Sequence, residues 1–441
     1  MNATVVGGGL AGSEAAWALA ERGVRVTLYE MRPKIRTPAH QTDRLAELVC
    51  SNSFKSVDLT NAHGLLKAEL RALGSILLPC ADAARVPGGT ALAVDREVFS
   101  SAVHQQVTSH PNITVIREEV AALPSPGIVA TGPLTSERLT AAIVARLGSS
   151  ALAFYDAIAP VVSADSLDHG RLYALSRYGK GEGNDYLNAP MDLAYNRFID
   201  ALIEADQFHG HEFDEVPYFE GCLPVEEMAR RGRETLRFGP MKPVGLADPR
   251  TGREPHAVVQ LRREDRAGQM WNLVGFQTRL RIPEQQRVFR MIPGLESAEY
   301  LRFGSIHRNS YLNSPASLGL ALTARDDSAL FFAGQITGVE GYTESLGTGL
   351  LAGINLARQL QGQPVAVPPP TTMLGGLYRY LREADPRHFQ PMNANFGLLD
   401  PLPGKVKKVR KKELLVERAQ ADFGKWMDET GIAAEAQGSH R

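Results

Sequence analysis

The first thirty residues alternate between apolar and polar positions in a way that predicts strand, helix and strand in succession. Residues 4–6 are a short apolar run, and residues 11–22 are mostly residue types that favour helices. Gly23 then stands where a helix commonly ends in a left-handed residue. Residues 24–29 alternate with the period of a half-buried strand, and Glu30 follows them. The pattern predicts a βαβ unit at the start of the chain.

The turn between the first strand and the helix has the spacing G-x-G-x-x-G. It consists of Gly7, Gly8, Gly9, Leu10, Ala11 and Gly12. In such turns the first glycine makes the bend, the second lets the backbone approach a pyrophosphate, and the third lets the helix pack on the strand. The start of the helix attracts phosphate, and an acid after the second strand, here Glu30, accepts from a ribose hydroxyl. The complete unit predicts a bound dinucleotide.

Further periodic segments follow this unit. Helices are expected at residues 65–73 and 96–109, and strands at residues 91–94, 113–117 and 127–130. The last of these strands leads into Thr131 and Gly132, a turn of small residues that permits close approach of the backbone to a cofactor. The same sequence is also a common structural turn, and the residues alone leave both interpretations open.

The character of the chain changes near residue 163, where polar, aromatic and Arg-rich segments separate short strand-like runs. A buried strand is expected again at residues 330–334, and a helix of small and apolar residues at 347–359. We therefore expect an α/β fold in which a mixed α+β domain is inserted into a Rossmann-like domain. The expected division is residues 1–162, 163–315 and 316–441, the last including a basic C-terminal segment.

A second glycine-rich turn lies between the expected strand and helix near residue 334. Gly334, Gln335 and Gly338 belong to it, and Tyr342 ends it. Two such turns at opposite ends of the chain suit one cofactor held from both sides, and the following helix would stabilise negative charge on a flavin ring. FAD fits better than NAD, because no second G-x-G-x-x-G unit is present. A purely structural connection is the alternative.

Composition narrows the class of protein. Hydrophobic residues make up 44% and charged residues 22% of the 441 residues, as in soluble globular proteins, and the net charge is −1. The first strand begins too early for a signal peptide, and no apolar run is long enough to span a membrane. Three widely spaced cysteines exclude a disulfide framework and a zinc ribbon. We expect a cytoplasmic protein without a metal site.

The three cysteines have different settings. Cys222 precedes Pro224, a residue favoured at the first position of a helix, so the helix N-terminus would favour its thiolate. Cys50 lies in a small polar segment with Lys55 nearby, which also suits a reactive thiol. Cys80 follows an apolar run and is expected to be a small buried side chain. The residues alone leave open that Cys50 and Cys222 are also only small buried side chains.

Basic residues concentrate in two regions. Residues 230–290 contain fourteen Arg or Lys against six Asp or Glu, and residues 405–412 contain six basic residues in eight. Phosphate backbones bind such regions with release of counterions. Many charge runs only face solvent, so the residues alone leave open whether these two regions bind nucleic acid.

These motifs together resemble the folate- and FAD-dependent tRNA (uracil-5-)-methyltransferases, the TrmFO family. The similarity covers nearly the whole chain and includes VVGGGLAGSEAAW, LVCSNS, FEGCLPVEEMARRG, FGPMKPVGL, AGQITGVEGY and QPMNANFG. The first motif and AGQITGVEGY are shared with the related GidA tRNA enzymes, which carry a long helical C-terminal domain that we do not expect here.

The resemblance implies an FAD-binding domain of the glutathione reductase type and a specific reaction. A one-carbon unit from 5,10-methylenetetrahydrofolate would reach C5 of uridine 54 in the tRNA T-loop, with FAD reduced by NAD(P)H. Cys50 and Cys222 would be the functional thiols, with Cys222 as the nucleophile at C6, and Tyr342 would lie against the flavin. No membrane and no protein partner are implied. The alternatives are GidA-like modification of the wobble uridine, or an RNA-binding flavoprotein without methyltransferase activity.

Overall fold

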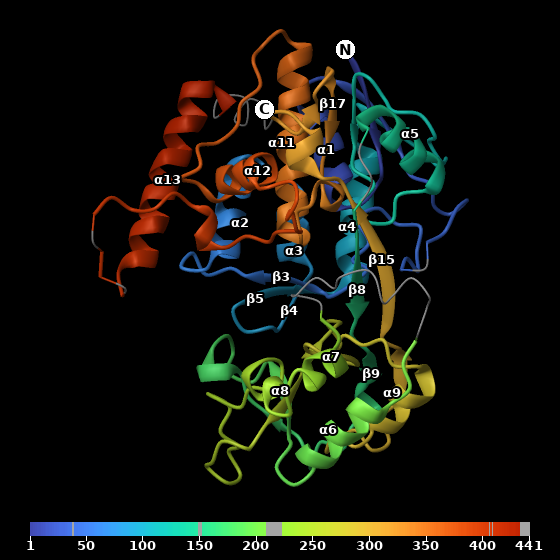
Figure 1. The fold of residues 1–441 in the computed structure, drawn as a ribbon, viewed down its shortest axis with the longest axis vertical. Coiled ribbons are helices and arrows are strands. Elements are labelled where there is room, and N and C mark those ends of the chain that lie inside the picture. The colour runs from blue at the N-terminus through green and yellow to red at the C-terminus, as the bar shows by residue number, and fades with distance from the viewer. Residues whose placement is uncertain (38, 149–151, 209–222, 405, 408, 433–441) are drawn as a thin grey trace.

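The computed structural model describes residues 1–441 except 38, 149–151, 209–222, 405, 408 and 433–441. The described residues form a large lobe and a small lobe, seen above and below in Figure 1. A two-stranded antiparallel ribbon joins them, made of β8 (Leu152–Ile158) and β15 (Ser305–Tyr311). The chain thus leaves the large lobe along one strand of this ribbon and returns along the other.

The large lobe is built on a six-stranded sheet of order β16-β17-β7-β1-β2-β6. All neighbouring strands run parallel except β16 and β17. The strands are β1 (Asn2–Val6), β2 (Arg25–Tyr29), β6 (Ile113–Ile116), β7 (Gly127–Val129), β16 (Thr323–Ala324) and β17 (Asp327–Phe332). Val6 pairs with Tyr29 on one side and with Val129 on the other, and Val129 pairs with Phe332. The four carboxyl ends therefore meet at one edge, where parallel sheets bind ligands.

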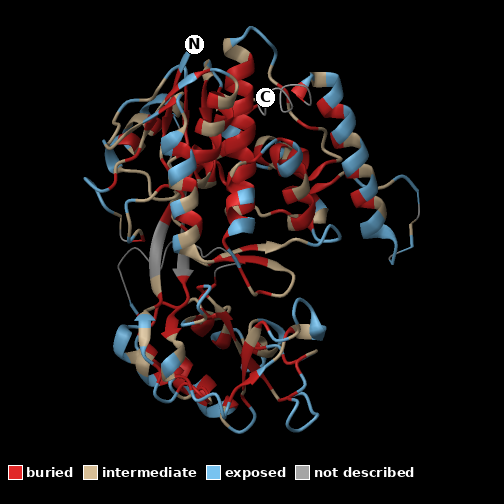
Figure 2. Ribbon diagram, turned by 180° about the vertical axis from the view of Figure 1, so that it is seen from behind, coloured by how far each residue is buried: buried red, intermediate tan, exposed pale blue. Residues whose placement is uncertain are grey.

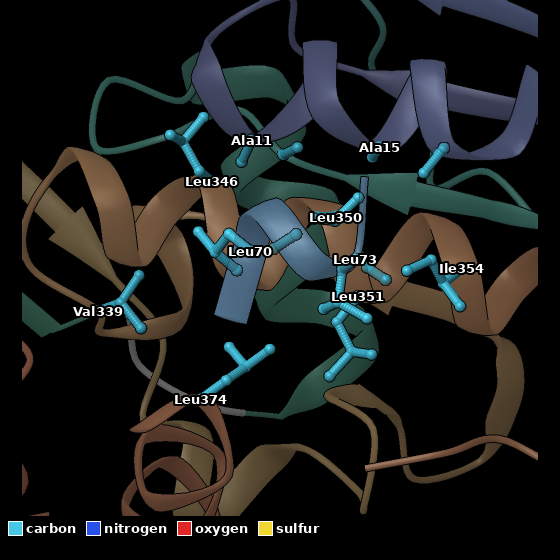
Figure 3. Close-up of a cluster of buried hydrophobic side chains, with 14 of the residues drawn as sticks. Ala11, Ala15, Leu70, Leu73, Val339, Leu346, Leu350, Leu351, Ile354 and Leu374 are labelled. Carbon is cyan, nitrogen blue, oxygen red and sulfur yellow. The ribbon is translucent and has the colours of Figure 1, made fainter. Parts of the chain in front are cut away.

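Two helices pack closely against each other over this sheet, α1 (Leu10–Glu21) and α11 (Tyr342–Leu360). Residues 343–358 of α11 are all buried, and Figure 2 shows this helix as the buried centre of the large lobe. Ala11 and Ala15 of α1 face α11 in Figure 3. The small side chains on both helices are what allow their backbones to come so close.

The other helices of the large lobe surround this pair. They are α2 (Ala62–Ala72), α3 (Leu77–Ala83), α4 (Arg96–Ser109), α5 (Glu137–Leu147), α10 (Ser314–Ser317), α12 (Met373–Glu383) and α13 (Lys411–Thr430). Leucines of α2, α11 and α12 meet in one apolar cluster, shown in Figure 3. A three-stranded sheet, β3 (Ser53–Ser56), β5 (Ala91–Val94) and β4 (Arg85–Val86), lies on the side of the large lobe that faces the small lobe (Figure 1).

The small lobe has its own sheet and its own apolar core. The sheet is antiparallel, with the strands β10 (Tyr173–Ala174), β11 (Tyr186–Pro190), β12 (Val258–Arg263), β13 (Met270–Leu273), β9 (Val161–Ser163) and β14 (Tyr300–Arg302) in this order. The helices are α6 (Tyr195–Glu204), α7 (Val225–Arg230), α8 (Thr235–Phe238) and α9 (Ile282–Phe289). Its buried side chains form a cluster separate from that of the large lobe. The α/β class with an inserted α+β unit is confirmed, and the exact domain division stays a prediction.

Several element boundaries differ from those predicted from the sequence. α11 begins at Tyr342, not near residue 347, because Gly341 with a φ of 119° ends the preceding turn there. α7 begins at Val225, so Pro224 is the residue before the helix rather than its first residue. α1 begins and ends one residue earlier than expected, and Gly23 has the predicted left-handed conformation, with a φ of 75°. The first βαβ unit is thus confirmed.

Candidate functional site

The glycine turn after β1 forms an open cradle at the edge where the strands end. A side chain at Gly7 would lie 2.5 Å from the carbonyl oxygen of Ala130, and one at Gly12 would lie 1.7 Å from that of Gly7. At Gly9, in contrast, nothing lies within 4 Å of the position of a side chain. The first hydrogen bond of α1 runs from Ser13 N–H to the Gly9 carbonyl, so the N–H groups of the first turn point toward this opening. The turn fits a phosphate group.

Glu30 closes one side of the cradle, and its carboxylate is held by hydrogen bonds. The Gly8 N–H donates to Oε2 at 3.0 Å, and the Arg32 N–H donates to Oε1 at 3.0 Å. Arg32, which is fully buried, also binds Glu30 through its guanidinium and pairs with Glu47 at 3.0 Å. Burial alone would raise the pKa of Glu30, but the charge and the hydrogen bonds of Arg32 hold that pKa below its usual range. The sequence did not reveal this role of Arg32.

Two adjoining cavities run along this edge of the sheet. The first, of about 70 Å³, is lined by Gly7, Gly8, Gly9, Glu30, Arg32, His40 and Thr131, among others. The second, of about 100 Å³, is lined by Gly9, Leu10, Ala11, His40, Glu47, Thr131, Gly132, Gly334, Gln335 and Tyr342, among others. The shared residues make the two cavities one elongated groove, which leads from Glu30 to the start of α11.

Most of the predicted cofactor residues line this groove, and two do not. Thr131 and Gly132 follow β7, and Gly334 and Gln335 follow β17, so both turns reach the groove from the sheet. Gly12 packs under the turn against Gly7, as a helix-packing position should. A side chain at Gly338 would meet the ring of Phe389 at 2.5 Å, and this residue faces the protein interior. The contacts of all these residues with a cofactor stay predictions.

Tyr342 and Cys50 lie together at the far end of the groove. The Cys50 N–H donates to the Tyr342 hydroxyl at 2.9 Å, and that hydroxyl donates to the Ser51 carbonyl at 2.9 Å. The ring of Tyr342 packs on Phe54, with centroids 5.5 Å apart. Cys50 itself is partly exposed. The structure therefore brings the backbone of Cys50 next to Tyr342, although the two residues are far apart in the sequence; their roles stay predictions.

The predictions for the other two cysteines stand differently. Cys222 lies outside the described residues, so its relation to the groove and to α7 stays a prediction. Cys80 is buried in α3, and burial raises the pKa of its thiol to about 11, with a smaller contribution from the charge of Glu14. It is the inert side chain that the sequence predicts. Among the described residues, no group of three or more His, Cys, Asp or Glu could hold a metal ion.

The two basic regions differ in how their charges are used. In the small lobe, Arg230 pairs with Glu227, Arg233 with Asp200, and Arg237 with Glu234. Lys407, Lys411 and Lys412, before and at the start of α13, are exposed. Most of the arginines near residue 230 thus have acidic partners within the lobe, which favours a structural role for them. No helix in the described part of the chain has the length and apolar character to cross a membrane.

The fold and the groove define a dinucleotide-binding α/β protein with an inserted lobe, and known proteins of this kind are similar to it. A family model described as glucose inhibited division protein A matches residues 2–364. The solved structure of Aquifex aeolicus GidA in its form I crystal superimposes with a TM-score of 0.69, at 16% identity, over 98% of this chain and 78% of that one. This likeness supports the fold alone.

Sequence relatives are closer. The methylenetetrahydrofolate--tRNA-(uracil-5-)-methyltransferase TrmFO of Geobacter sulfurreducens is 58% identical over 427 residues, 96% of this chain and 98% of the relative. The protein of the same name from Thermus thermophilus is 55% identical over 426 residues, 96% of each chain. The chain therefore belongs to the TrmFO family, and the resemblance inferred from its motifs is confirmed.

Proposed function

We infer that this protein transfers a one-carbon unit from 5,10-methylenetetrahydrofolate to C5 of uridine 54 in the T-loop of tRNA, giving 5-methyluridine. The observation that carries this conclusion is the identity of 53–58% with proteins of that name over nearly the whole chain. The groove along the carboxyl ends of the strands supports this proposal, and so does the contact between Cys50 and Tyr342, which lines the end of the groove. The same identity disfavours wobble-uridine modification and a flavoprotein without methyltransferase activity.

FAD fits the groove. The open backbone at Gly9 and the start of α1 suit its pyrophosphate, Glu30 lies where a ribose hydroxyl would be held, and the turn at Gly334 and Gln335 reaches the other end. When bound, FAD reduced by NAD(P)H supplies the two electrons that turn the folate's methylene unit into a methyl group. The protein's part is to hold the flavin, the folate and the flipped base together without water.

Cys222 is the nucleophile in this proposal. Uracil C5 is a poor nucleophile, and a thiolate that adds to C6 makes C5 enolate-like, so that it can attack the one-carbon unit. Acidic residues at the start of a helix would work against a thiolate there, but Glu226 and Glu227, in the first turn of α7, are both bound by other groups. Glu226 is buried and accepts from Thr278 and Arg279, and Glu227 pairs with Arg279 at 2.6 Å.

Cys50 is the proton-transfer group. After C5 has formed its new bond, the C5–H bond must break before the methyl group can be completed. Cys50 is a partly exposed residue whose backbone N–H binds the hydroxyl of Tyr342, and Tyr342 lines the end of the groove where the flavin ring is expected. Its thiolate would take the C5 proton, and the electron pair of the C5–H bond would stay on the uracil as an enolate.

The tRNA has to present its base to this site. Uridine 54 is stacked within the T-loop, so we expect it to be flipped out into the groove. The exposed lysines at the start of α13 are the better candidates for phosphate contacts, because the arginines near residue 230 are largely paired. The cytoplasm is the compartment where this substrate and the reduced nicotinamide cofactor meet.

The reaction is tested with unmodified tRNA, methylenetetrahydrofolate and NADPH or NADH, followed by position-resolved nucleoside mass spectrometry. We expect 5-methyluridine at position 54 only. Modification of the wobble uridine would support the GidA-like alternative, and bound FAD that neither nicotinamide cofactor reduces would support a flavoprotein without this activity.

The two thiols are separated by a trapping experiment. With 5-fluorouridine at position 54 the C5 substituent cannot leave as a proton, so a covalent protein–RNA adduct should accumulate. Cys222→Ala should abolish the adduct but keep FAD and its reduction, because neither needs this sulfur. Cys80→Ala is the matched control and should form the adduct normally. An adduct that survives Cys222→Ala but not Cys50→Ala would reverse the two assignments.

A further inference from the structure

The backbone around Cys50 is held on both of its polar groups by side chains from distant elements. Arg96, the first residue of α4, donates to the Leu48 carbonyl at 2.6 Å and to the Cys50 carbonyl at 2.8 Å. On the other side, the Cys50 N–H is bound to the Tyr342 hydroxyl. Because the backbone is fixed from both sides, the direction of the Cys50 side chain is set by its own χ1 rotation.

The small lobe completes this arrangement. Glu264, just after β12, binds the Arg96 guanidinium, with Nε to Oε2 at 2.6 Å, and its side chain is only 4% exposed. Arg302, in β14, donates from Nη2 to the Cys50 carbonyl at 3.3 Å. Asn52 donates to the Arg263 carbonyl at 2.8 Å and so fixes the chain two residues further on. The segment that carries Cys50 is therefore a junction between the two lobes.

Two charged side chains meet at the carbonyl of Cys50. The guanidinium groups of Arg96 and Arg302 both lie within electrostatic range of Cys50 and of the Tyr342 hydroxyl, and the carboxylate of Glu264 lies within range of both arginines. Burial lowers the pKa of Arg302 to about 10, with a further contribution from Arg96, so Arg302 stays charged at neutral pH. Arg96 is held in turn by its salt bridge to Glu264. The carbonyl of Cys50 is thus bound by one arginine that belongs to the small lobe and by another that the small lobe holds in place.

We propose that Arg302 of the small lobe and Arg96, locked by Glu264, are positioning residues that fix the backbone of Cys50 and so aim its side chain for removal of the C5 proton. This inference rests on the proposed role of Cys50 in that step. It gives the inserted lobe a part in the chemistry of the large lobe, because Arg302 and the Glu264 that holds Arg96 both belong to the small lobe.

The direct test is the rate of alkylation of Cys50 in the FAD-loaded protein at one fixed pH. Iodoacetamide reports how the thiol is presented, and mass spectrometry of the Cys50 peptide follows this residue separately from Cys80 and Cys222. Arg302→Gln should raise the rate severalfold, because the Cys50 carbonyl loses its donor from the small lobe and the segment loosens. Arg302→Lys should stay nearer to the wild-type rate, because it keeps a donor. Arg146→Gln, which removes an exposed arginine of α5 paired with Asp326, is the matched control and should change nothing.

A kinetic isotope measurement tests whether the two arginines position Cys50 for proton removal. With tRNA carrying deuterium at C5 of uridine 54, Arg302→Gln and Arg96→Lys should lower kcat, leave KM for tRNA unchanged and increase the deuterium isotope effect, because proton removal becomes slower. Unchanged flavin content and unfolding temperature would show that the variants are folded. If Arg302→Gln does not fold, Arg96→Lys and Arg302→Lys still decide the kinetic part.

Two results would overturn the proposal. One is an alkylation rate of Cys50 that is the same in Arg302→Gln and wild type. The other is an isotope effect that neither arginine variant changes. Failure of the proposed function gives a different result: normal methylation by Cys50→Ala would remove the thiol from the reaction, while the alkylation rates would still report whether Arg302 positions it.

Discussion

The contact between α1 and α11 allows a sharp test of how tightly the cofactor cradle is built. A methyl group placed on Gly349 of α11 would lie 2.2 Å from the carbonyl oxygen of Ala11 and 2.6 Å from its Cα. These are backbone atoms of the first turn of α1, so no side chain can move aside to make room. In α13, by contrast, a methyl group on Gly424 would meet nothing within 4 Å.

The expected magnitudes follow from these distances. Alanine is better than glycine inside a helix by about 1 kcal/mol, and this gain is common to both positions. Overpacking of a filled interior costs about 1–3 kcal/mol, and only Gly349→Ala should incur it. Gly424→Ala should therefore stabilise slightly, and the gap between the two variants should equal the steric cost, near the upper end because the obstacle is backbone. The same substitution at both sites cancels most effects on the unfolded chain.

Urea unfolding and the flavin content of the purified proteins measure both consequences. Gly349→Ala should unfold at lower urea than Gly424→Ala and should hold less FAD, because α1 can relieve the contact only by moving the start of the helix that faces the pyrophosphate. Gly353→Ala, whose methyl group would lie 2.6 Å from the Ala15 carbonyl oxygen, should behave similarly but more mildly. Equal stability and equal flavin content in Gly349→Ala and Gly424→Ala would refute the reasoning.

Three further outcomes are expected. Gly9→Val should lose FAD yet unfold normally, because its side chain would enter open space within the cradle; full flavin occupancy would contradict the assignment. Replacing both Lys411 and Lys412 by Gln should reduce the slope of log affinity for tRNA against log salt by up to about 0.9 per lost contact, while the paired Arg233→Gln should leave it unchanged. Burial raises the pKa of Glu69 from 4.5 to about 8, so as pH rises between these values the wild type should lose stability relative to Glu69→Gln; a constant difference across that range in urea unfolding would contradict this.

The sequence predicted those parts of the site whose residues lie next to one another in the chain. The turn from Gly7 to Gly12 and the acid at Glu30 belong to one βαβ unit, so glycine spacing and strand periodicity were enough to place them. The second glycine turn, at Gly334, was found in the same way. The first helical turn of α11 was not predicted, because the small residues of this helix do not show a clear helical pattern. The predicted helix therefore began five residues too late, after Tyr342 instead of at it.

The parts that the sequence did not predict depend on partners far along the chain. Arg302 reaches a carbonyl 252 residues away, and Arg96 reaches one 46 residues away, and no spacing rule connects them. Each arginine is also one of many basic residues, so its type carried no signal by itself. Near Arg230 the ion pairs are partly local, as with Glu227 and Glu234, but the partner of Arg233 is Asp200 from another element, which no spacing rule predicts.

Helix packing, rather than only the loop that carries it, fixes the position of Cys50 relative to the glycine turn after β1. Tyr342 begins α11, and its hydroxyl binds the backbone on both sides of the bond between Cys50 and Ser51. The same helix touches the backbone of α1 through Gly349, and α1 begins at the opening beside Gly9. The thiol and the phosphate end of the groove are therefore connected through two helices in backbone contact. A shift of α1 against α11 would move both ends of the site at once, which is why small residues are required along this contact.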